Sequence, residues 1–306
     1  MARSWSVLIV MATAFTMPAT ALAQSALDLY KAAGARAMKP VATIAYGPDP
    51  LQVADLRLPQ GRGPHPVAIV IHGGCWLASI DDRRGTAGFA EALGRRGFAT
   101  WNIEYRRLGN TGGGWPGTFT DVAAATDKLV EVAPRYNLDL KRVTVVGHSA
   151  GAHLALWVAS RPRLPSPWSQ TSLRPQSVVA IDGPAALAPF IGVDAQACRG
   201  QSVVVPLIGG TPAQKPVEYR LASPADHLPL GVHQLVIEGV FADLLRPYVA
   251  AARSSGDTVD VLAPPAANHF DIVTPGTPSG EAVADFIAAN ALTPGRNAPR
   301  WGKPGQ

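Results

Sequence analysis

The chain has 306 residues, 47% of them hydrophobic and 16% charged, with a formal net charge of +5. Its Lys and Arg residues are scattered and never run beyond adjacent pairs, which argues against a nucleic-acid-binding protein. The length is enough for one large domain with a substantial core.

The N-terminus has the order of features of a secretory signal peptide. A positive charge at Arg3 precedes an apolar run over 7–17, and the small residues "ALA" end at Ala23. The run is too short to span a bilayer, which argues against the alternative of a membrane anchor. We therefore predict cleavage after Ala23, export to the periplasm or the medium, a folded domain over 24–292 and a loose Pro-, Gly- and Arg-rich tail over 293–306.

Strand-like and helical patterns then alternate along the chain. A short helix at 26–37 precedes two edge strands at 41–46 and 51–58. Buried strands are predicted at 66–72, 98–105, 142–147, 177–181, 233–239 and 258–263, and helices at 83–96, 120–133, 149–160, 242–255 and 280–290. This alternation predicts a doubly wound, mostly parallel α/β sheet. Residues 183–232, with short helices at 185–191 and 217–222, read as an excursion over the active-site edge of the sheet.

Polar side chains follow several of these predicted strands. They are His72, Glu104, Ser149, Asp182 and Asp243. Because the carboxyl ends of parallel strands meet at one edge of the sheet, where ligands bind, these side chains are expected to gather there.

Ser149 lies in the motif G-H-S-A-G at 147–151, between a strand and a helix. The motif alone is weak, since glycines and a serine also make an ordinary strand-to-helix turn. Its placement favours a strained turn that exposes a nucleophilic hydroxyl. Such a serine needs a base, a carboxylate that orients the base, and amides that bind the oxyanion.

Several motifs together resemble the α/β-hydrolase fold, in the branch of small esterases, including feruloyl-esterase-like enzymes, and arylformamidases that carry an HGGxW loop. They are "HGGCW" at 72–76, "IEYRR" at 103–107, "GGGWPGTFTDV" at 112–122, "GHSAGAHLA" at 147–155 and "NHFDIV" at 268–273. The resemblance extends from about residue 51 to 290 and implies an acyl-enzyme mechanism on Ser149.

The resemblance also implies roles for residues around the serine. The oxyanion donors would be the amides of Gly74, Cys75 and Ala150. His72 would brace the glycine loop, and Glu104 beside Arg106 and Arg107 reads as an ion pair that braces a loop. We expect Trp76, Trp115 and His148 to line the substrate pocket, although Trp115 and His148 also fit purely structural roles.

His269 is the predicted base. It follows the last strand and precedes the final helix, and it keeps the chain order Ser, Asp, His of this fold. The acid is expected after the strand that ends near 238. Asp243 is the prediction, one residue beyond the family's usual spacing, with Phe241 at the position that some arylformamidases use. Glu238 is the alternative.

These residues predict a serine esterase that cleaves short-chain acyl esters, such as acetyl or feruloyl groups on plant-derived material. Arylformamidase activity is the alternative reaction. A catalytically silent binding module and a peptidase are further alternatives. No metal or nucleotide motif occurs, so no cofactor is expected.

The expected partner is a small-molecule ester, with no nucleic acid and no membrane. Cys75 and Cys198 are the only cysteines, and an exported chain could join them, but the sequence leaves a free Cys75 equally open. It also leaves the oligomeric state open.

Overall fold

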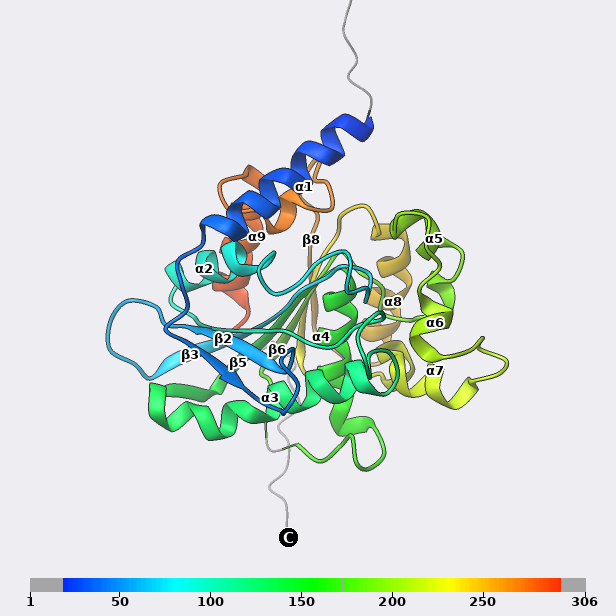
Figure 1. Cartoon of the computed structure of the whole chain (residues 1–306), viewed down its shortest axis with the longest axis horizontal. Coiled ribbons are helices and arrows are strands. Elements are labelled where there is room, and N and C mark those ends of the chain that lie inside the picture. Colours follow the sequence, from blue (N-terminus) through cyan, green and yellow to red (C-terminus); the bar gives the residue numbers. More distant parts are fainter. Residues whose placement is uncertain (1–18, 172, 293–306) are drawn as a thin grey trace, which may run out of the picture.

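The computed structural model describes residues 19–171 and 173–292, which form an α/β sheet structure (Figure 1). Its sheet has the order β1-β2-β4-β3-β5-β6-β7-β8, in which β2 runs antiparallel to both of its neighbours, β1 and β4, and every other neighbouring pair is parallel. The strands are β1 (Ala42–Ala45), β2 (Val53–Arg57), β3 (His65–Ile71), β4 (Ala99–Ile103), β5 (Leu138–His148), β6 (Ser177–Ile181), β7 (His233–Ile237) and β8 (Val259–Leu262). The predicted mostly parallel sheet is confirmed.

Helices cover both faces of the sheet. One face packs against α3 (Gly117–Tyr136), α4 (Ala150–Ser160) and α8 (Ala242–Ser254), and the other against α1 (Ala19–Arg36), α2 (Ala87–Arg95) and α9 (Pro278–Asn290). Successive strand residues point to opposite faces, so Ile69 and Ile71 of β3 join one core and Ala68 and Val70 the other. This explains why the strands read as continuous apolar runs.

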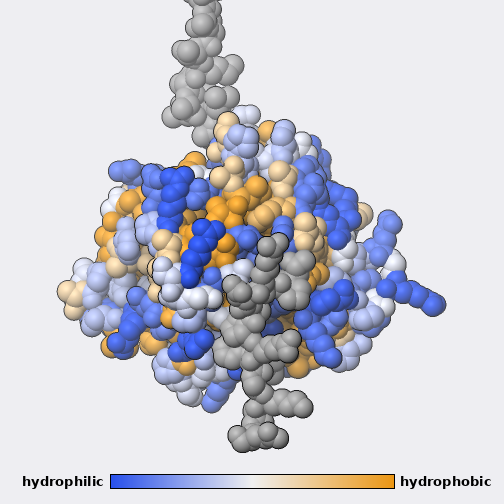
Figure 2. All heavy atoms as spheres, turned by 180° about the vertical axis from the view of Figure 1, so that it is seen from behind, coloured by the Kyte–Doolittle hydropathy of each residue, from blue (hydrophilic) through white to orange (hydrophobic). Residues whose placement is uncertain are grey.

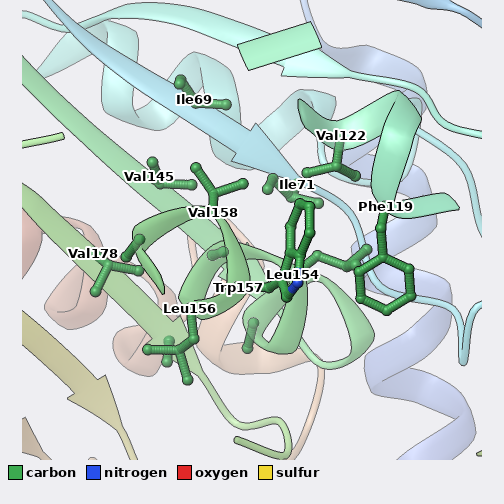
Figure 3. Packing of buried hydrophobic residues seen from close by; sticks show 14 of the residues in the cluster. Ile69, Ile71, Phe119, Val122, Val145, Leu154, Leu156, Trp157, Val158 and Val178 are labelled. Carbon is green, nitrogen blue, oxygen red and sulfur yellow. The ribbon is translucent and has the colours of Figure 1, made fainter. Parts of the chain in front are cut away.

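The core on the α4 side is rich in large side chains. Figure 3 shows Ile69 and Ile71 from the sheet facing Trp157 and Phe119 from the helices. The rings of Phe119 and Trp157 meet edge-to-face with centroids 5.1 Å apart. This packing fixes α4, and therefore the turn that leads into it, against the sheet.

The segment 183–232 crosses the carboxyl edge of the sheet, as predicted. It contains α5 (Val193–Ala197), α6 (Val204–Ile208), α7 (Pro216–Ala222) and short 3-10 turns at Ala188–Phe190 and Pro224–His227. Two side chains of α4 form hydrogen bonds to the backbone of this segment. His153 Nε2 donates to the carbonyl of Ala222 (2.8 Å), and Trp157 Nε1 donates to that of Leu221 (3.0 Å).

The predicted terminal segments are only partly covered. Residues 1–18 and the predicted tail at 293–306 lie outside the described residues, and α1 continues through the predicted cleavage point after Ala23. No helix in the described part of the chain is long and apolar enough to cross a membrane. From behind, polar side chains surround a smaller hydrophobic area (Figure 2).

Candidate active site

The turn around Ser149 is sharply constrained. β5 ends at His148 and α4 begins at Ala150, so Ser149 alone makes the turn, with φ 57° and ψ −123°. An L-residue adopts such a conformation only where its surroundings hold it, and such residues cluster at functional sites. A Cβ atom at Gly147 would lie 1.9 Å from the carbonyl oxygen of Gly151, which explains the glycine on the strand side. The residue pattern around Ser149 therefore produces the strained elbow that it predicts.

His269 lies on the loop between β8 and α9 and reaches the same cavity as Ser149. Its loop is held by Asn268, whose Oδ1 accepts from the amides of Phe270 (2.9 Å) and Asp271 (3.1 Å). His148 Nε2 donates to the backbone carbonyl of His269 (2.7 Å). The backbone that carries the predicted base is therefore fixed on two sides.

Asp182, not Asp243, is the carboxylate paired with His269. Asp182 Oδ2 lies 2.7 Å from His269 Nδ1. The amides of Val240 (3.0 Å) and Phe241 (2.8 Å) also donate to this carboxylate. Burial by itself would raise the pKa of Asp182, but the hydrogen bonds from His269 and Phe241 hold it below its usual range. The carboxylate is thus kept ionised and aimed at Nδ1.

The prediction that Asp243 is the acid is wrong. Asp243 lies in the first turn of α8 with 96% of its side chain exposed, and its carboxylate pairs with Arg246 (2.9 Å). The alternative, Glu238, pairs with the same arginine (3.1 Å). Phe241 occupies the place beside the histidine, its ring edge-on to His269 at 5.2 Å between centroids.

The carboxylate that meets His269 comes instead from the end of the neighbouring strand. Asp182 directly follows β6, which lies between the serine strand β5 and β7. The sequence carried a signal for it, since Asp182 is one of the polar residues that follow predicted strands. The family's usual spacing instead predicts an acid after β7, one strand beyond β6.

The predicted oxyanion loop passes directly over the serine. A Cβ atom at Gly73 would lie 2.9 Å from Ser149 Cβ. Gly74, Cys75 and Trp76 all have φ between 53° and 93°, and successive backbone amides in turns of this kind can form a concave binding site for an anion. Gly74, Cys75 and Ala150 line the cavity together with Ser149.

A disulfide fixes this loop to the excursion. Cys75 is bonded to Cys198, with Cα atoms 5.9 Å apart and 123 residues apart in sequence. The cysteine question that the sequence left open is thereby answered in favour of the bond. The disulfide therefore links the excursion covalently to the oxyanion loop.

A buried ionic network supports the same loop from behind. Arg107 Nη1 donates to Glu104 Oε1 (2.6 Å), and His72 Nε2 lies 3.1 Å from that oxygen. Burial alone would raise the pKa of Glu104, but His72 and Arg107 lower it to about 2. The bracing role expected of His72 and Glu104 fits this geometry. Arg106, however, pairs with Asp121 (2.7 Å) rather than with Glu104.

Of the three predicted pocket residues, two line the cavity and one does not. Trp76 and His148 line the cavity. Burial, together with the nearby charge of His269, lowers the pKa of His148 to about 3, so it stays neutral and donates to the His269 carbonyl. Trp115 is not part of the cavity, because its ring packs against Phe119 (4.9 Å) and Trp168 (5.4 Å) in the core.

The cavity over Ser149 holds about 190 Å³. Its walls are mostly apolar, with Phe190 from the excursion, Phe241 from the loop between β7 and α8, and Phe270 from the histidine loop. Leu27 of α1 completes it, a contribution that sequence reasoning missed, because nothing in a short amphipathic helix indicates which edge it covers. Among residues 19–171 and 173–292 no group of three or more His, Cys, Asp or Glu side chains could hold a metal ion.

Several solved structures share this architecture, and the three that follow are described as esterases. Esterase B from Lactobacillus rhamnosis superposes with a TM-score of 0.71 at 20% identity, covering 88% of this chain and 93% of that one. A truncated carbohydrate esterase from gut microbiota gives 0.68 at 21% identity, with 82% and 95% covered. A thermophilic esterase from the planctomycete Thermogutta terrifontis gives 0.65 at 16% identity, with 83% and 96% covered. At these identities the likeness establishes the shared α/β-hydrolase fold.

A family model adds evidence from the sequence itself. No curated protein matches the chain. The model of the family described as BD-FAE matches residues 54–240, more than half of the chain, and includes the oxyanion loop, Ser149 and Asp182. With its α/β-hydrolase fold and this match, the chain belongs to the BD-FAE family.

Proposed function

We propose that the protein is a serine esterase that cleaves short-chain carboxylic esters through an acyl-enzyme. The observation that carries the proposal is the 2.7 Å contact between His269 Nδ1 and Asp182 Oδ2, in a cavity that also exposes Ser149 in its strained turn. A nucleophile, a base and an orienting carboxylate are thus supplied by three different strand ends.

In this mechanism His269 Nε2 accepts the proton of Ser149 as its Oγ attacks the ester carbonyl carbon. The ionised Asp182 keeps the proton of the imidazole on Nδ1 and stabilises the imidazolium that forms. His269 then gives its proton to the leaving alkoxide, and the acyl group remains on Oγ. Water attacks this acyl-enzyme with His269 again as base, which releases the acid and restores the serine.

The oxyanion of each tetrahedral intermediate would be bound by the amides of Gly74, Cys75 and Ala150. Two features support this assignment. Gly74 and Cys75 follow a left-handed path and line the cavity together with Ser149. Ala150 is the first residue of α4, so its amide has no partner within the helix. The loss of one such donor typically costs about a hundred- to a thousandfold in kcat.

Short acyl chains fit the size and lining of the cavity. It holds about 190 Å³ between aromatic walls, and each buried methylene contributes only about 0.8 kcal/mol. Two structures of the same fold support this proposal: esterase B of Lactobacillus rhamnosis with a tributyrin phosphonate inhibitor, and the Thermogutta terrifontis esterase with propionate bound.

Export to the periplasm or the medium is part of the proposal. The N-terminal charge, apolar run and small-residue site support it, and so does the disulfide, because such bonds persist in oxidising compartments.

The test is a substrate panel on the purified protein and on Ser149→Ala. We expect kcat/KM for p-nitrophenyl acetate or butyrate to exceed that for the octanoate, and Ser149→Ala to lose at least about a thousandfold in kcat while keeping its circular dichroism. A fluorophosphonate probe should label the wild type only. Preference for N-formylkynurenine over every ester would make the protein an arylformamidase, and absence of labelling would make it a silent relative.

A further inference from the structure

One positive charge at the cavity has no carboxylate partner. Arg199 lines the same cavity as Ser149 and His269, and its side chain is exposed. Within the described part of the chain no acidic side chain forms an ion pair with it. The arginines of the nearby loops differ, because Arg106 and Arg107 are paired with Asp121 and Glu104.

The backbone of Arg199 is held close to the oxyanion loop. The preceding residue, Cys198, is bonded to Cys75, which contributes to that loop. The turn is also closed by hydrogen bonds from the amide of Gly200 to the carbonyl of Ala195 (2.7 Å) and from that of Gln201 to Cys198 (3.1 Å). The guanidinium is therefore attached to a fixed point beside the reacting centre and not to a free loop.

The conformation of Arg199 is itself unusual. With φ 56° it occupies the left-handed position that follows α5, where glycine is strongly preferred. The next residue, Gly200, also has a positive φ (82°), which a glycine adopts without strain. At Arg199 the same backbone region is strained because the residue carries a side chain. A strained residue of this kind at a ligand cavity is an observation that points to function.

Two carboxylates lie at or near the cavity, and neither pairs with Arg199. Asp81 also lines it, but its Oδ2 accepts from the hydroxyl of Tyr30 (2.8 Å) and its Oδ1 from the amide of Asp82 (3.0 Å). Asp182 is buried and paired with His269. Burial raises the pKa of the Asp81 carboxyl, which disfavours its ionised form. Arg199 is the one Lys or Arg among the described residues that line the cavity, whose walls are otherwise mainly apolar.

We propose that Arg199 selects esters that carry a carboxylate on the acyl or the alcohol part. A guanidinium presents two parallel N–H groups that match a carboxylate, and such charge-assisted pairs are stronger than neutral hydrogen bonds. This inference rests on the esterase activity proposed above and specifies its substrate class.

The test compares charged and neutral esters of matched shape. Monoethyl glutarate against ethyl valerate places the charge on the acyl part, and 4-acetoxybenzoate against its methyl ester places it on the alcohol part. Wild-type protein should prefer the charged member of at least one pair in kcat/KM. Arg199→Gln should lower the charged-to-neutral ratio about ten- to a hundredfold, mainly through KM, and Arg199→Lys should lose less. Raising salt from about 50 to 500 mM should weaken the preference.

Arg220→Gln is the matched control, because Arg220 is an exposed arginine of the same excursion that does not line the cavity. It should leave the ratio unchanged. An equal preference for both members of each pair, or a ratio that Arg199→Gln does not alter, overturns the inference while the esterase proposal stands. A protein that hydrolyses neither neutral nor charged esters overturns both.

Discussion

Replacement of Asp182 by asparagine tests which carboxylate orients the base. Asp182 accepts three hydrogen bonds, from His269 and Val240 on one oxygen and from Phe241 on the other. An asparagine has one oxygen and one NH₂ group, so either Phe241 or the other two donors must face a donor instead of an acceptor. In both orientations the negative charge that stabilises the imidazolium is lost.

We expect Asp182→Asn to lower kcat on the order of ten thousandfold, equivalent to about 5 kcal/mol in the activation barrier. The matched control is Asp243→Asn, which removes a charge from an exposed side chain paired only with Arg246. It should stay within about twofold of wild type, because exposed ion pairs contribute little.

The assay is the initial rate with p-nitrophenyl butyrate, normalised to folded protein by circular dichroism. A large loss in Asp243→Asn together with near-normal activity in Asp182→Asn would refute the assignment of Asp182. Similar losses in both variants, with unchanged spectra, would show that Asp182 is not the only carboxylate on which the orientation of His269 depends.

Four further predictions address the supports of the site, the size of the cavity and the export of the protein. Glu104→Gln should cost about 3 kcal/mol of unfolding free energy at pH 7, because the folded pKa of Glu104 is about 2 against an ordinary value of 4.5. Since that pKa is depressed, the stabilisation is complete above pH 4.5 and disappears as the pH falls towards 2. The unfolding free energies of wild type and variant, measured by urea titration, should therefore converge at low pH. A difference in unfolding free energy that stays constant with pH would contradict this. Cys198→Ser should cost about 2–5 kcal/mol and lower kcat more than it raises KM, because the bond closes a long loop and holds the oxyanion loop, and intact mass should rise by about two daltons on reduction of the wild type. Leu27→Trp should shift preference from butyrate towards acetate by filling the cavity, whereas the same change at the exposed Leu29 should not. N-terminal sequencing of the exported protein should begin at Gln24, and an unprocessed N-terminus would contradict the signal peptide.

The sequence by itself determined the features that depend on neighbours along the chain. Continuous apolar runs separated by helical patterns predict the parallel sheet and its carboxyl edge, because strand and helix periodicity are local properties. Ser149 between a strand and a helix, and His269 in the loop before the last helix, follow from the same local order.

Only the tertiary structure decided which carboxylate meets the histidine. Asp182 and His269 are 87 residues apart in sequence and meet because the loop after β8 reaches across the end of β7 to the end of β6. The pairing of β6 with β7 also brings the amides of Val240 and Phe241 to the same carboxylate. The Cys75–Cys198 bond, the core position of Trp115 and the contribution of Leu27 to the cavity have the same origin. Each depends on the distance between segments that are far apart along the chain. Those distances are set by how the helices and the excursion pack on the sheet, and a local sequence pattern does not predict that packing.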